Sequence, residues 1–213
     1  MMKVIPFLLF LTPSLWAQQF VQLTSPNGAV GFQFHLTPQA PVYSITYQGQ
    51  PVIEDSELSL DFREGSLGKN LKFRRVHYDQ KDETYPLVVG KTSLARNYYQ
   101  EAAIELVSTQ APLWQVTVYV RAYDDGLAFR YEFPKQPDWK TYEMLDEHST
   151  FRFAANPVVY TLLRKNYKTS HEGLYTTTTL DSTHYPVPPL MVQLRSHPGR
   201  ASGKSWSRRL DWN

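Results

Sequence analysis

The fold is decided by the stretch Tyr123-Asp124-Asp125-Gly126-Leu127-Ala128-Phe129-Arg130-Tyr131-Glu132-Phe133-Pro134. Apolar and polar side chains alternate on both sides of its turn, over residues 113–122 and 127–133. Because successive side chains of a strand point to opposite faces, each flank predicts a strand with one apolar face. Asp125-Gly126 is a strong hairpin signal, since glycine accepts the positive φ of a tight turn. The stretch therefore predicts a β-hairpin with one face in water.

A turn centred on Asp125-Gly126 also predicts a register for this hairpin. It places Ala122 opposite Phe129 on the apolar face. It also places Arg121 opposite Arg130 on the polar face, a like-charge pair that costs up to about 1 kcal/mol unless a carboxylate neutralises it. Three carboxylates are candidates for that role: Glu132 on the hairpin, and Glu101 and Glu105 on a neighbouring strand.

The rest of residues 18–193 shows further strand signals, punctuated by turn residues such as Ser25-Pro26-Asn27-Gly28 and Gln48-Gly49. Strands are predicted at 20–23, 29–36, 42–47, 50–53, 58–62, 71–78, 93–108, 151–153, 158–160, 174–180 and 190–194. Segment 93–108 also contains good helix formers, but Asn97-Tyr98-Tyr99 favours a strand there. Many strands without intervening helices predict an all-β fold, a large antiparallel β-sandwich.

The two ends of the chain differ from this body. Residues 1–17 combine Lys3, a short apolar run and the small residue Ala17, the pattern of a signal peptide cleaved after Ala17. The apolar run is too short to span a bilayer of about 30 Å, so no membrane span is expected after cleavage. Residues 194–213 form a basic tail with no alternation, typical of a disordered segment.

Composition excludes several classes of function. The chain has no cysteine, so neither disulfides nor thiolates contribute. The formal net charge is +2, but the tail alone carries five cations against one anion, which leaves the body mildly acidic. The sequence therefore gives no support for a nucleic-acid partner. Gly199 to Ser205 resembles a phosphate loop, but only three residues separate its glycines where four are needed.

Candidates for chemistry are few among the remaining residues. The six histidines show no metal-ligand spacing, and no serine lies in a Gly-x-Ser-x-Gly turn. Asp146-Glu147-His148 lies at an expected strand end. Glu172 lies in a tyrosine-rich loop that the strand pattern does not explain. Its carboxylate is a candidate ligand for calcium, which takes oxygen ligands from distant segments; a solvated surface glutamate is the alternative.

Several of these motifs together resemble one family. Ser25-Pro26-Asn27-Gly28, the hairpin at 43–53, Arg96-Asn97-Tyr98-Tyr99, the stretch quoted at the opening and Glu172-Gly173-Leu174-Tyr175-Thr176 occur in the order found in the N-terminal domain of glycoside hydrolase family 97. The resemblance runs over residues 18–193, and Asp-Gly-Leu-Ala-Phe-Arg-Tyr-Glu-Phe-Pro is its most specific element.

The resemblance implies a galactose-mutarotase-like super-sandwich from an exported bacterial α-glucosidase or α-galactosidase, periplasmic or secreted. It implies that this domain packs on a catalytic (β/α)8 barrel, borders the pocket for an α-glucoside or α-galactoside, and contributes one calcium ligand, which matches Glu172. The catalytic carboxylates of the family lie in the barrel, so no catalytic residue is expected here. The family pattern stops at Gln193, which predicts a C-terminally incomplete sandwich and a frameshift or truncated gene behind residues 194–213.

Two other functions stay open from the sequence. The chain could be a free exported carbohydrate-binding or structural module, with Trp139, Trp206 and Trp212 as candidate sugar-stacking residues. It could also lack activity and fold poorly, because a sheet edge left without its neighbouring strand is exposed.

Overall fold

The computed structural model describes residues 20–111, 113–136, 139, 141–163, 172–182, 186–193 and 204–207, the last two ranges by their backbone alone. The predicted signal peptide, the loop at 164–171 and most of the basic tail lie outside these residues. Within the described ranges the one helical element is a 3-10 turn, η1 (Leu180–Ser182). Among the described residues no helix is long and apolar enough to cross a membrane.

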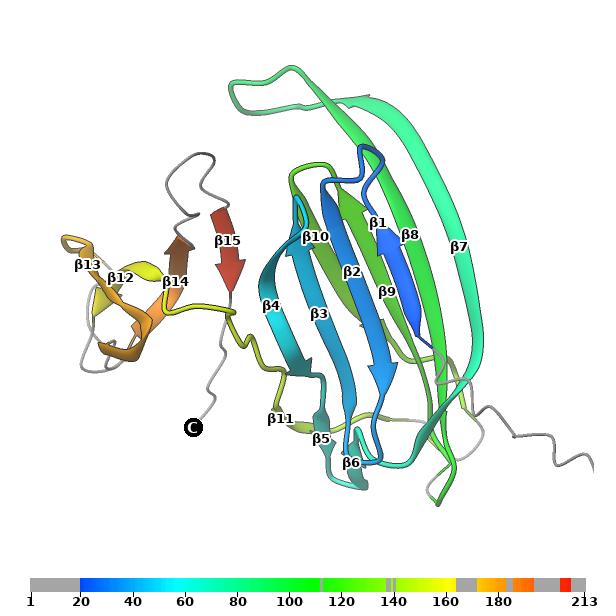
Figure 1. Ribbon diagram of the computed structural model, residues 1–213. Coiled ribbons are helices and arrows are strands. Elements are labelled where there is room, and N and C mark those ends of the chain that lie inside the picture. The colour runs from blue at the N-terminus through cyan, green and yellow to red at the C-terminus, as the bar shows by residue number, and fades with distance from the viewer. Residues whose placement is uncertain are drawn as a thin grey trace, which may run out of the picture.

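Two four-stranded antiparallel sheets face each other in a sandwich (Figure 1). The first has the order β1-β2-β3-β4 and consists of β1 (Val21–Thr24), β2 (Val30–Leu36), β3 (Pro41–Tyr47) and β4 (Gln50–Glu57). The second has the order β10-β9-β8-β7 and consists of β7 (Leu71–Pro86), β8 (Leu94–Ser108), β9 (Gln115–Tyr123) and β10 (Gly126–Glu132). The predicted all-β antiparallel class is confirmed.

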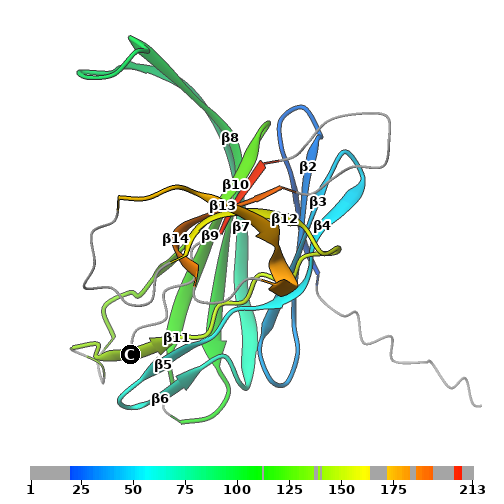
Figure 2. The ribbon, with the colours of Figure 1, turned by 90° about the vertical axis from the view of Figure 1, so that its left-hand side faces the viewer.

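Two smaller sheets complete the described structure. A three-stranded sheet lies at one end of the sandwich, with β11 (Met144–Glu147), β5 (Leu60–Phe62) and β6 (Gly65–Leu67) in that order (Figure 2). The other sheet has the order β13-β12-β14-β15, from β12 (Val158–Leu163), β13 (Thr176–Thr179), β14 (Pro186–Gln193) and β15 (Lys204–Ser207). Strand β15 lies within the basic tail, where the sequence predicted no strand.

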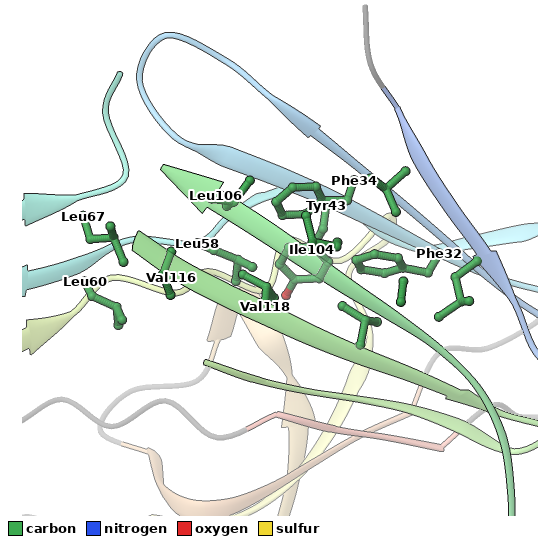
Figure 3. Packing of buried hydrophobic residues seen from close by; sticks show 14 of the residues in the cluster. Phe32, Phe34, Tyr43, Leu58, Leu60, Leu67, Ile104, Leu106, Val116 and Val118 are labelled. Atoms are coloured by element: carbon green, nitrogen blue, oxygen red, sulfur yellow. The ribbon is translucent and has the colours of Figure 1, made fainter. Parts of the chain in front are cut away.

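The core lies between the two large sheets. Phe32, Phe34 and Tyr43 of the first sheet face Ile104 and Val118 of the second, and all five are at most 2% exposed (Figure 3). Every second residue of β9 is buried, as the alternation over 113–122 predicted. Burial of these side chains is the main stabilising contribution, at about 1.5–3 kcal/mol for each large apolar residue.

The turn of the β9–β10 hairpin differs from the prediction. Tyr123 pairs with Gly126, so Asp124-Asp125 forms the two-residue loop, and Gly126 does not adopt a positive φ. The register is therefore shifted by two residues. Arg121 lies opposite Ala128 in place of Arg130. Because a shift of two keeps every side chain on its own face, the apolar alternation could not reveal it.

The shift separates the two arginines that were predicted to oppose each other. Arg121 instead pairs with Glu101 of β8, with Nε 2.6 Å from Oε2, which confirms Glu101 among the candidate partners. Arg130 lies opposite Tyr119, with its guanidinium carbon 4.2 Å from the ring centroid. Arg130 also pairs with Glu132 at 2.9 Å. The predicted charge conflict is therefore absent from the hairpin.

Other predicted elements differ in extent. The segment 93–108 forms strand β8, which confirms the preference for a strand over a helix there. The Gln48-Gly49 hairpin is also confirmed, and both residues have the positive φ that a type I′ turn requires. Strand β7 continues eight residues beyond the predicted end at Tyr78. Residues 151–153 form one isolated bridge, from Phe153 to Ile53, where a strand was predicted.

The turn at Asp124 is joined to the first turn of the chain. Asn27 donates its backbone N–H to Asp124 Oδ1 at 2.9 Å, and Asn27 Oδ1 in turn accepts from the N–H of Ala29 at 2.8 Å. This contact links the two large sheets at one end of the sandwich. A net contribution of about 1 kcal/mol is expected for such a hydrogen bond to a charged acceptor at an exposed site.

We expect Asp124→Ala to lower the free energy of unfolding by about 1 kcal/mol, because it removes the acceptor of the Asn27 N–H. Asp125→Ala is the matched control, since its carboxylate lies in the same turn without this bond, and it should change stability by less than about 0.5 kcal/mol. Urea denaturation followed by circular dichroism measures both. Equal effects of the two substitutions would contradict the assignment.

Candidate functional site

Glu172 lies at the start of the segment that leads into β13. Its side chain is exposed, as are those of the next residues, with Leu174 94% and Tyr175 58% exposed. Strand β13 pairs antiparallel with β12, from Thr176 opposite Thr161 to Thr179 opposite Val158. The candidate ligand thus lies on the small sheet β13-β12-β14-β15 and outside the core of the sandwich.

The far end of β13 is held by a network of polar contacts. Thr179 donates its hydroxyl to Asp181 Oδ1 at 2.6 Å, and Asp181 receives a further hydrogen bond from Ser182 at 3.1 Å. The hydrogen bond from Thr179, followed by those of Asn156 and Ser182, lowers the pKa of Asp181. Leu180 donates its N–H to Pro157 O at 3.1 Å. These contacts fix the end of β13 against the start of β12.

Glu172 suits a hard cation by its chemistry. A carboxylate supplies the oxygen donors that calcium takes. Among the described residues, no group of three or more His, Asp or Glu side chains is arranged to hold a metal ion. The predicted calcium site at Glu172 therefore stays a prediction.

The sequence Asp146-Glu147-His148 forms a polar link between β11 and β5. His148 Nε2 lies 2.7 Å from Asp61 Oδ2 and 3.7 Å from Asp146 Oδ2, while Ser66 of β6 donates to the second oxygen of Asp61. The hydrogen bond from Ser66, and then that with His148, holds the pKa of Asp61 below its usual value against the opposing effect of desolvation. Ser66 contacts Asp61 and not the imidazole, so the trio lacks the serine–histidine contact of a nucleophilic triad.

Glu147 belongs to a second polar chain in the same region. It accepts a hydrogen bond from Ser149 Oγ at 2.8 Å, and Ser149 in turn contacts the Tyr131 hydroxyl at 3.1 Å. Burial raises the pKa of Tyr131. The phenol therefore stays protonated at neutral pH and acts as a fixed hydrogen-bonding group between β10 and the segment after β11.

Trp139, a candidate for sugar stacking, is buried in an aromatic cluster. It is 7% exposed, and its ring lies 4.4 Å from that of Trp114 and 4.2 Å from that of Tyr142, between centroids. It lines a hollow of about 280 Å³ together with Phe133, Lys135, Gln136 and Tyr142. Gln136 is engaged by the backbone of Gln115, at 2.8 and 3.0 Å. Trp139 is thus largely covered by its neighbours, and the side chains of Trp206 and Trp212 lie outside the described residues.

Comparisons with known proteins place this geometry in one family. The chain matches the family model for the glycosyl-hydrolase 97 N-terminal domain over residues 23–199. It is 30% identical over 134 residues to the retaining α-galactosidase of Bacteroides thetaiotaomicron. These residues make up 61% of this chain and 19% of that enzyme.

Solved structures show the same fold. A glycoside hydrolase family 97 enzyme from Pseudoalteromonas sp. strain K8, solved with panose and with acarbose, superposes with a TM-score of 0.76 at 21% identity. A β-arabinopyranosidase superposes with a TM-score of 0.72 at 23% identity. Each match covers 81% of this chain, but the chain spans only 26% and 29% of these enzymes.

Acid should destabilise the chain partly through Asp61. Because its pKa is lower in the folded than in the unfolded chain, its stabilising contribution is present above the ordinary value of about 3.9 and is lost as the pH falls through and below that value. We therefore expect Asp61→Asn to lose stability less steeply than the wild type between about pH 5 and 2. Urea unfolding at stepped pH measures the two slopes. Identical slopes would contradict the link between Asp61, Ser66 and His148.

Proposed function

The chain belongs to the glycosyl-hydrolase 97 N-terminal family, and from this membership we propose that it is the β-sandwich of a calcium-dependent family 97 glycosidase, packing on a catalytic (β/α)8 barrel and bordering its carbohydrate pocket. The single observation that supports this most is the family match over residues 23–199. The sandwich of β1–β4 on β7–β10 agrees with it, since family 97 enzymes carry the same fold.

Glu172 is proposed as the contribution of this chain to a calcium ion. It is exposed, it carries oxygen donors, and the strand that its segment leads into, β13, is held by its ladder with β12 and by the contacts of Asp181 with Thr179 and Asn156. The other ligands would come from the barrel. When bound beside the scissile bond, such an ion would supply Lewis-acid stabilisation of developing negative charge. Glu172 would hold the ion from the side of the sandwich and so couple the two parts of the enzyme.

The proposed ligand is an α-glucoside or an α-galactoside. Relatives include an enzyme solved with panose and acarbose, and a retaining α-galactosidase. Both activities are compatible with a sandwich that borders the pocket, because the choice of sugar rests on residues that touch the substrate. Export to the periplasm or medium, through the signal pattern of residues 1–17, completes the proposal.

This chain alone is proposed to be inactive, because glycoside hydrolysis needs two carboxyl groups at a fixed separation across the bond, which the family resemblance assigns to the barrel. Purified protein incubated with p-nitrophenyl α-glucoside and α-galactoside should release no nitrophenol above a heat-denatured control. Turnover by the wild type that Glu172→Gln abolishes would contradict the proposal.

The calcium ligand has a test that does not depend on activity. The chain is mixed with the part of the Bacteroides thetaiotaomicron α-galactosidase that follows its matched region, and calcium is titrated by calorimetry. Glu172→Gln should weaken calcium binding by at least about tenfold, since it removes one charged ligand. Glu54→Gln, an exposed glutamate on β4, is the matched control and should leave the affinity unchanged. Equal affinities for wild type and Glu172→Gln would refute this role.

A further inference from the structure

Strands β7 and β8 extend beyond the sandwich as a two-stranded arm (Figure 1). Strand β8 pairs with β9 only from Gln100 to Val107, whereas it pairs with β7 over its whole length. From Leu94 to Tyr99, therefore, β8 has β7 as its only ladder partner among the described residues. The arm projects beyond the other strands of both large sheets in two perpendicular views (Figures 1 and 2).

Charged side chains form ion pairs and hydrogen bonds along the shaft of this arm, residues 79–86 of β7 and 94–99 of β8. Arg96 makes two hydrogen bonds to Asp82, at 2.8 and 2.7 Å, and Lys81 pairs with Glu83 at 2.9 Å. Asn97 donates to the same Glu83 at 2.8 Å. Such charges along an open strand discourage edge-to-edge pairing with another chain. The shaft thus has the character of a stiff, water-exposed spacer.

The tip of the arm has the opposite character. Its turn is closed by a hydrogen bond from Leu87 N–H to Ser93 O at 2.9 Å, and it contains Gly90 at φ 112°. Val88 is 98% and Val89 83% exposed, next to Leu87 at 39% and Leu94 at 59%. Four aliphatic side chains gathered at the end of a charged spacer form an exposed apolar group, the feature that marks a protein interaction site.

The position of the tip indicates what covers it. The tip bends toward the side of the sandwich on which β12–β15 lie, the side that carries the segment after Glu172 (Figure 1). That segment exposes Leu174 and Tyr175. Two apolar groups on the side proposed to face the barrel favour one large partner that reaches both. The solved relatives are almost four times as long as the part that this chain spans, so they carry a further part large enough for this role.

We propose that the arm tip, formed by Leu87, Val88, Val89 and Leu94, is a docking element that seats in an apolar recess of the catalytic part of a family 97 glycosidase. This inference rests on the proposed function and adds a second contact, separate from Glu172. Burial of aliphatic side chains supplies affinity at the tip, while the length of the charged shaft fixes the distance between the tip and the sandwich.

The test measures binding of the full chain to the catalytic part of the Bacteroides thetaiotaomicron α-galactosidase by biolayer interferometry in calcium buffer. The double variant Val88→Asp/Val89→Asp should weaken binding at least tenfold, because each aspartate would have to be desolvated in the recess. Val88→Ile/Val89→Ile should bind as the wild type does. Leu113→Asp is the matched control, because Leu113 is 73% exposed and precedes β9 at the opposite end of β8 from the tip.

Each outcome has a distinct meaning, with circular dichroism confirming that every variant is folded. Full binding by Val88→Asp/Val89→Asp would overturn the docking role of the tip and leave the proposed function standing. No binding by the wild type would overturn the proposed function and this inference with it. A wild-type dimer in sedimentation that becomes monomeric in the double variant would show that a second copy occupies the tip, which also overturns the proposal.

Discussion

The contact between the two large sheets is the interaction on which the rest of the structure depends. Phe34 and Tyr43 from one sheet and Ile104 and Val118 from the other are almost completely removed from water. The chain has no disulfide to share this role, so burial of apolar area is the dominant stabilising term. The sheet β11-β5-β6 adds Leu60 and Leu67 to this core (Figure 3). The sheet β13-β12-β14-β15 and the arm, which carry the proposed contacts with a partner, lie outside the cluster and rely on it for their positions.

Much of the fold could be predicted because alternation of side chains reports which face of a strand is buried. The Gln48-Gly49 turn could also be placed, since it needs two positive φ angles and glycine supplies one of them. The register at Asp125-Gly126 could not be predicted, because the alternation of apolar and polar residues is unchanged by a shift of two residues. The contact that accompanies the observed register, from Asn27 to Asp124, spans 97 residues and has no local signal.

The candidate site was less accessible to sequence reasoning. Local pattern alone gave Glu172 no advantage over a solvated glutamate, and only the family resemblance raised it to a candidate ligand. The arm was missed because its outer half alternates poorly, with charged residues such as Lys81 and Asp82 on opposite faces. A signal did exist in Val88-Val89 followed by Gly90, two β-branched apolar residues at a turn where polar residues are usual. Trp139 shows the opposite error, since an unpatterned tryptophan proved to be buried.

Strand β8 belongs to two environments at once. Its second half, with Ile104 and Leu106, runs through the interior, and its first half is a shaft in water. A molecule bound at the arm tip would thus be connected to the core of the protein through a single strand. By thermodynamic linkage, a partner that binds only the native chain at one hundred times its dissociation constant adds about 2.7 kcal/mol to folding. A partner bound at that end would therefore add to the stability that the sequence of this domain provides alone.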